Sequence, residues 1–129
     1  MVEPVLWGGG IPPERHHDPE LVAHAARVAF ELGADVIKVP IPSDPRALEG
    51  LSRKLPVPIL LMGGPATDPA HLFRLIEGSM GAGAAGVALG RNVWQHPEPA
   101  AMVAALNRLV HHGATAGEAL DVLKRGGQA

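Results

Sequence analysis

One lysine of this sequence lies where its amine could take part in chemistry. Lys38 is the charged residue inside the apolar run 36–41, whereas Lys54 and Lys124 lie near the ends of predicted helices, where a solvated cation is ordinary. Partial burial of Lys38 would favour its neutral form. A neutral amine can attack a carbonyl and form an imine that withdraws electrons from the adjacent carbon. The spacing equally permits a lysine that extends to solvent or pairs with a carboxylate such as Asp35 or Asp44.

Two turns that contain glycine form a second candidate site. Gly63 and Gly64 follow the apolar run 57–62, and Gly90 and Arg91 follow the run 85–89. Glycine lets a ligand approach the backbone closely, and the forked guanidinium of arginine suits phosphate. Glycines also end strands without binding anything, so either turn alone is weak evidence. Together the turns predict a phosphate site formed by Gly63, Gly64, Gly90 and Arg91.

The elements that must position these residues alternate between strand and helix. Apolar runs typical of buried strands cover residues 2–7, 36–41, 57–62 and 85–89. Helical periodicity covers residues 19–32, 45–55, 68–81, 97–111 and 115–124. Asp18 is expected to cap the first helix, and Thr67 or Asp68 the third.

Such an alternation predicts an α/β fold with parallel strands joined by right-handed crossovers, in a single domain over residues 1–129. Ligands bind beyond the carboxyl ends of parallel strands. Trp7 ends one predicted strand, Lys38 lies within the next, and the two glycine turns follow the other two, so we expect these residues to meet at one edge.

Composition excludes several classes of function. The net charge is −2, which gives no basic footprint for nucleic acid, and the absence of cysteine excludes disulfides and thiolate metal sites. The seven histidines have no metal-ligand spacing, and the glycines 8–10 lack the dinucleotide fingerprint, so we expect neither metal nor cofactor. No apolar run has the length of a membrane span, and no secretion signal is evident. A cytoplasmic protein is therefore expected.

Three motifs resemble the class I, Schiff-base-forming aldolases of the archaeal fructose-bisphosphate type, with their relatives the aminodideoxyheptulosonate synthases and the autoinducer-2 aldolase-thiolases. ELGADVIK at 31–38 is similar to the segment that delivers the imine-forming lysine, VPILLMGGP at 57–65 to the seventh strand and its phosphate turn, and GVALGRNVWQ at 86–95 to the eighth strand and second phosphate turn. The resemblance covers about residues 2–113. It implies that Lys38 is catalytic and that the chain is a (β/α)4 half of a TIM barrel, strands five to eight.

The sequence departs from this family at several points. Trp7 stands where the family has the tyrosine that moves protons, and an indole N–H cannot do so, although Trp7 could pack over the substrate or donate one hydrogen bond. Met62 stands where a serine often precedes the glycines. The family aspartate lies on a first strand outside this chain, and 129 residues are too few for a whole barrel, which usually needs about 200 or more.

The resemblance implies a lyase that forms a lysine imine with a phosphorylated keto sugar, such as fructose bisphosphate, and cleaves or forms a C–C bond. Two alternatives remain: a related transaldolase or thiolase acting on a phosphorylated dione, and a non-catalytic half-barrel that binds phosphosugars. Three explanations of a half-barrel compete: the sequence is a fragment of a longer protein, it is a divergent remnant, or it is a natural half that dimerises. We expect a homo-oligomer, because a second copy would cover the exposed sheet edges.

Overall fold

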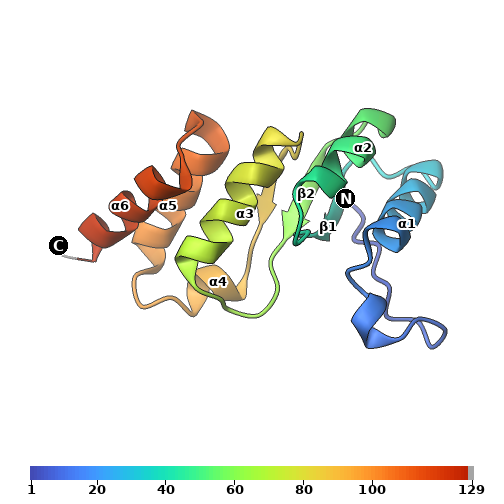
Figure 1. The fold of residues 1–129 in the computed structure, drawn as a ribbon, viewed down its shortest axis with the longest axis horizontal. Coiled ribbons are helices and arrows are strands. Elements are labelled where there is room, and N and C mark those ends of the chain that lie inside the picture. Colours follow the sequence, from blue (N-terminus) through green and yellow to red (C-terminus); the bar gives the residue numbers. More distant parts are fainter. Residues whose placement is uncertain (128–129) are drawn as a thin grey trace.

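The computed structural model describes residues 1–127 and contains a parallel sheet with helices on one side (Figure 1). The strands are β1 (Ile37–Pro40), β2 (Ile59–Met62) and β3 (Gly86–Ala88), in the spatial order β1-β2-β3. The helices are α1 (Pro19–Glu31), α2 (Arg46–Lys54), α3 (Pro69–Gly81), α4 (Arg91–Trp94), α5 (Pro99–His112) and α6 (Ala116–Gly126), preceded by a 3-10 turn, η1 (Pro13–Arg15). The register pairs Lys38 with Leu60 and Leu60 with Gly86.

Side-chain caps fix the starts of helices α1 and α3. The carboxylate of Asp18 accepts hydrogen bonds from the backbone N–H groups of Glu20 and Leu21, at 3.0 and 3.4 Å. Asp68, rather than Thr67, caps α3 by accepting from the N–H of His71 at 2.9 Å. These caps confirm the helix starts that the sequence predicts.

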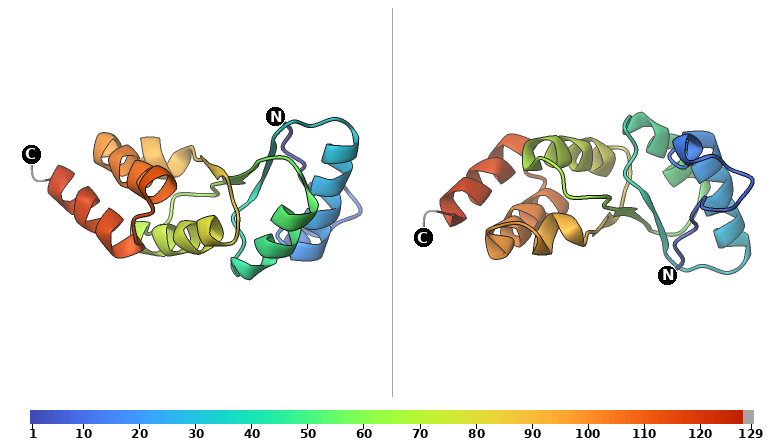
Figure 2. Two further views of the ribbon diagram at one scale, coloured as in Figure 1. Left: turned by 90° about the horizontal axis from the view of Figure 1, so that it is seen from above. Right: turned by 90° about the horizontal axis from the view of Figure 1, so that it is seen from below.

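Two apolar clusters hold the helices against the sheet. Alternate residues of β1 and β2 pack under α1 and α2; they are Ile37, Val39, Ile59 and Leu61. Helices α3, α5 and α6 share a second cluster around Phe73 and Met102. Ile41, Met80 and Val87 contact both clusters. The α5–α6 pair therefore lies at one end of the molecule and α1 at the other, with the sheet between them (Figure 2).

The first predicted strand, residues 2–7, does not form. Val2 makes a single parallel bridge with Ile37, through hydrogen bonds from Val2 N–H to Val36 O and from Lys38 N–H to Val2 O, each 2.9 Å. Pro4 has no N–H with which to continue the ladder. The described residues therefore contain three strands and one bridge instead of the four strands predicted.

The opposite face of the sheet is only partly covered. Lys38, Pro40, Leu60, Met62 and Ala88 lie on this face, and all are partly exposed. Parallel sheets are normally buried on both faces, so this face offers space for a ligand or further protein.

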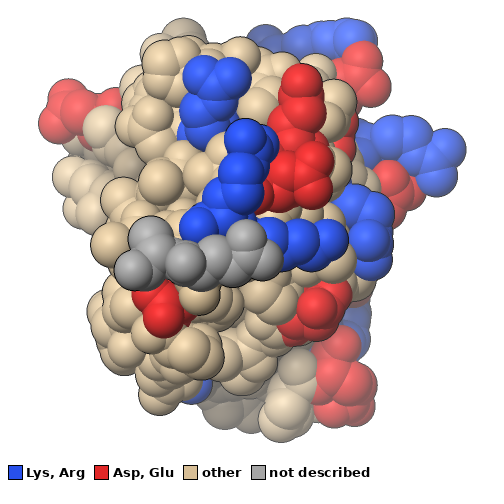
Figure 3. Space-filling model, turned by 90° about the vertical axis from the view of Figure 1, so that its left-hand side faces the viewer, with Lys and Arg blue, Asp and Glu red and all other residues tan. Residues whose placement is uncertain are grey.

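The helices in residues 1–127 include none with the length and apolar character needed to cross a bilayer. At the end formed by α5 and α6, basic and acidic side chains lie next to each other (Figure 3).

Candidate active site

A cavity of about 600 Å³ opens where the strands end, and all six site residues predicted from the sequence line it. These are Trp7, Lys38, Gly63, Gly64, Gly90 and Arg91. Other lining residues come from the segment 3–7, the loop at His16 and His17, and the first turns of α3. The parallel arrangement thus brings four separate segments of the sequence to one edge, as predicted.

Lys38 points to the partly covered face because its neighbours Ile37 and Val39 point into the helix-covered core. Its Nζ lies 2.8 Å from Oε2 of Glu3, and 19% of the Lys38 side chain and 35% of the Glu3 side chain are exposed. The carboxylate partner is therefore Glu3, and not Asp35 or Asp44. Asp44 pairs with Arg46 instead, and the hydrogen bond from that guanidinium lowers the pKa of Asp44.

Glu3 is a residue that the sequence reasoning missed. In the strand predicted for residues 2–7, side chains would alternate with a period of two, so residues 3, 5 and 7 would share one side. Glu3 would then lie on the same side of the segment as Trp7, and the bridge between Val2 and Ile37 places Glu3 next to Lys38. This alternation was a usable signal for an acid next to Lys38. Trp7 itself lines the cavity with 70% of its surface exposed.

The two glycine turns approach each other closely. A Cβ added to Gly63 would lie 2.8 Å from Cδ2 of Leu89 and 3.1 Å from Nδ2 of Asn92. A Cβ added to Gly90 would lie 2.6 Å from the ring of Trp94. A Cβ on Gly64 would meet nothing within 4 Å. A side chain at Gly63 or Gly90 would therefore crowd its neighbours, whereas the backbone of Gly64 is left open for a ligand.

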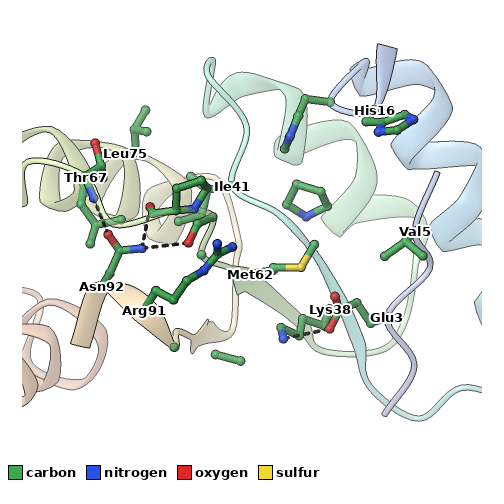
Figure 4. A pocket seen from close by; sticks show the side chains of 18 of the residues that line it. Glu3, Val5, His16, Lys38, Ile41, Met62, Thr67, Leu75, Arg91 and Asn92 are labelled. Atoms are coloured by element: carbon green, nitrogen blue, oxygen red, sulfur yellow. Dashed lines mark hydrogen bonds and ion pairs between the residues drawn. The ribbon is translucent and has the colours of Figure 1, made fainter. Parts of the chain in front are cut away.

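Asn92, also missed in the sequence, joins the two turns. Its side chain is buried, with 4% of the residue exposed. Its Oδ1 accepts from the N–H of Thr67 at 3.0 Å, and its Nδ2 donates to the carbonyls of Pro65 and Gly64 at 3.3 and 3.5 Å. Figure 4 shows these bonds on one side of the pocket, the Lys38–Glu3 pair on the other, and Arg91 and Met62 between them.

Arg91 supplies a positive charge to this cavity. Within residues 1–127 no carboxylate lies at ion-pairing distance from its guanidinium. The same part of the chain holds no group of three His, Asp or Glu side chains arranged to bind a metal ion. The cavity can therefore present an amine, a neighbouring carboxylate and an anion-binding guanidinium to one small molecule.

Comparison with known proteins identifies the class of protein to which this chain belongs. The family model described as DeoC/LacD family aldolase matches residues 1–96. The chain belongs to this aldolase family.

Relatives within the family cover several activities. The chain is 42% identical over 103 residues to the 2-amino-4,5-dihydroxy-6-oxo-7-(phosphonooxy)heptanoate synthase of Streptomyces griseus, covering 79% of this chain and 38% of the relative. It is 42% identical over 106 residues to the class 1 fructose-bisphosphate aldolase of Thermoproteus tenax, covering 81% and 40%. The chain thus spans about two fifths of the length of these relatives.

A solved structure matches with a TM-score of 0.78 and 38% identity, over 84% of this chain and 43% of the other. It is an archaeal fructose-1,6-bisphosphate aldolase whose catalytic lysine is covalently bound to the carbinolamine intermediate of the substrate. The likeness supports a parallel α/β fold of the TIM-barrel aldolase kind.

Proposed function

We propose that this chain carries the imine-forming site of a class I aldolase that acts on a phosphorylated keto sugar. The observation that supports this most directly is that Lys38 shares one cavity with Arg91 and both glycine turns. Phosphate would bind at Gly63, Gly64, Gly90 and Arg91, and the carbonyl would lie at Lys38. The captured carbinolamine on the lysine of an archaeal relative is consistent with this role.

The chain acts, in this proposal, as strands five to eight of a TIM barrel, folded as one domain over residues 1–129. The order of Lys38 and the two glycine turns along the chain supports this assignment. Residues 2–7 would become a full strand when another strand pairs with their free side. The partly covered face of the sheet would then become the barrel interior.

Lys38 and Glu3 supply the atoms that the first steps need. The ammonium of Lys38 gives one proton to the Glu3 carboxylate, which lies 2.8 Å away. The free amine nitrogen forms a bond to the substrate carbonyl carbon, giving a carbinolamine. Its oxygen then takes up a proton and leaves as water, so that a protonated imine remains. The protonated Glu3 lies beside Lys38 and can return this proton to the carbinolamine oxygen.

Cleavage follows from the electron demand of the imine. The hydroxyl beyond the breaking C–C bond gives its proton to a water molecule and becomes an aldehyde, and the bonding electron pair moves toward the imine nitrogen to form an enamine. The enamine carbon then takes a proton back from water, and a second water hydrolyses the imine and frees Lys38. Trp7 cannot move these protons, but its indole could cover the substrate or donate one hydrogen bond.

Borohydride trapping tests the proposal. The protein is incubated with dihydroxyacetone phosphate, reduced, digested and analysed by mass spectrometry. The expected adduct lies on Lys38, is lost in Lys38→Met, and is retained in Lys54→Met, which changes an exposed lysine of α2 in the same way. An equal yield of adduct in Lys38→Met would refute the assignment.

Two other functions are separated by the same experiment. A transaldolase or thiolase acting on a phosphorylated dione would form the adduct with that dione in preference. A non-catalytic phosphosugar-binding half-barrel would bind phosphate without any adduct, and the replacement of the family tyrosine by Trp7 favours this second candidate.

We also propose that a homo-oligomer closes the sheet, because β3 and the segment 2–7 each have one side without a strand partner among residues 1–127. Sedimentation equilibrium at micromolar concentration tests this, and a purely monomeric mass would overturn it.

A further inference from the structure

We infer that Asn92 is a positioning residue that holds the two glycine turns in one fixed arrangement, so that their backbones can serve a single phosphate group. This inference deepens the proposed function and rests on it for the identity of the ligand. Asn92 lies in α4, and its side chain bonds to Gly64, Pro65 and Thr67, which are 25 to 28 residues away in sequence.

The hydrogen-bond pattern leaves the amide one orientation. Its oxygen faces a donor, the N–H of Thr67, and its nitrogen faces two acceptors, the carbonyls of Gly64 and Pro65. A flipped amide would place oxygen against both carbonyls and nitrogen against an N–H. Because the amide is buried, losing these partners would leave polar groups unpaired. The amide therefore fixes the backbone on both sides of Pro65.

Packing against Gly63 explains why an asparagine fits at position 92. The absent side chain of Gly63 leaves room for Nδ2, which would lie 3.1 Å from any Cβ at that position. Arg91 precedes Asn92 on α4, so the hydrogen bonds of Asn92 also fix the position of the Arg91 backbone relative to the turn 63–65. A shift of about 1 Å in a positioned group can cost up to about a hundred-fold in function. In this inference Asn92 acts through the groups that it holds.

The test compares Asn92→Ala and Asn92→Asp with the unaltered protein. The aspartate keeps the size of the side chain and the acceptor for Thr67, but replaces the donor that faces the carbonyls. Asn107→Ala is the matched control, since Asn107 is an exposed asparagine of α5 bonded to His112. Circular dichroism first establishes that each variant is folded.

The probe is inorganic phosphate, titrated into nitrogen-15-labelled protein while the amide signals of Gly64 and Gly90 are followed. We expect both Asn92 variants to bind phosphate about ten-fold more weakly or worse, a factor equivalent to ~1.4 kcal/mol, and Asn107→Ala to bind it unchanged. Imine trapping gives a second readout. The concentration of dihydroxyacetone phosphate needed for half-maximal trapping should rise by a similar factor, while trapping of unphosphorylated dihydroxyacetone stays the same.

Several outcomes overturn the inference: no phosphate binding by the unaltered protein, equal phosphate binding by the Asn92 variants, or equal loss of trapping with both ketones. If neither Asn92 variant folds, the residue is structural and the positioning role is rejected. Failure of the proposed function gives a different result, in which phosphate binding depends on Asn92 but no adduct forms on Lys38.

Discussion

Two adjacent glycines allow a stringent test of how the turn after β2 is packed. Gly63→Ala places a methyl group 2.8 Å from Cδ2 of Leu89 and 3.1 Å from Nδ2 of Asn92, whereas Gly64→Ala places it in open space. Neither glycine is among those with positive φ, so alanine is compatible with the backbone at both positions. Both substitutions also reduce the freedom of the unfolded chain, by about 0.4–1 kcal/mol each.

That common contribution cancels when the two variants are compared, and the difference reports the crowding at Gly63. Overpacking costs about 1–3 kcal/mol. The lower half of that range is expected, because Leu89 is only partly buried and its side chain can rotate, while Asn92 is held by its hydrogen bonds. We therefore expect Gly63→Ala to be less stable than Gly64→Ala by about 1–2 kcal/mol.

Urea unfolding followed by circular dichroism measures this difference, provided that the m-value is unchanged between the variants. The unaltered protein should lie between them or close to Gly64→Ala. Equal midpoints for the two variants would refute the reasoning, because they would mean that the turns do not approach each other as closely as described.

Two further predictions concern carboxylates. Glu3→Gln keeps the size of the side chain but removes the proton acceptor beside Lys38, so borohydride trapping should slow. Glu14 is an exposed acid in η1, and Glu14→Gln should be trapped at the rate of the unaltered protein. Equal trapping rates for all three proteins would remove Glu3 from the mechanism. In the folded protein, hydrogen bonds from the backbone and hydroxyl of Thr115 lower the pKa of Glu118 below its ordinary value of 4.5. These hydrogen bonds therefore contribute fully to stability above pH 4.5, and their contribution is lost as the pH falls through the lowered pKa. Glu118→Gln should therefore melt below the unaltered protein at pH 7, and the gap should narrow toward pH 3; a gap that widens on acidification would contradict the assignment.

Much of the architecture follows from local sequence signals. The caps at Asp18 and Asp68 confirm the expected helix starts, and the strand that carries Lys38 lies where the apolar run predicts it, shortened by one residue at each end. The run 2–7 was misleading, because a strand needs partners as well as suitable side chains. Pro4 interrupts the run, and among residues 1–127 no strand pairs with the other side of this segment. A single bridge therefore remains.

The site was predictable in part for a related reason. Parallel topology brings the ends of strands together, so the position of Lys38 and the two turns around one cavity follows from the pattern of elements. The partners of those residues do not follow from it. Glu3 contacts Lys38 across a bridge between segments 35 residues apart, and only the alternation of side chains along the segment 2–7 hints at that contact. Asn92 bonds to Thr67 through its side chain, and this bond depends on three-dimensional packing that no local pattern encodes.

Helix α3 connects the cavity with the far end of the molecule. Its first turns line the cavity through His71 and Leu72, and further along it the carboxylate of Glu77 accepts a hydrogen bond of 2.9 Å from the N–H of Ala116, the first residue of α6. A ligand that binds the folded state lowers the population of any opening that disturbs α3. Amide hydrogens of α6 should then exchange more slowly when the cavity is filled, so a helix that never meets the ligand can report its presence.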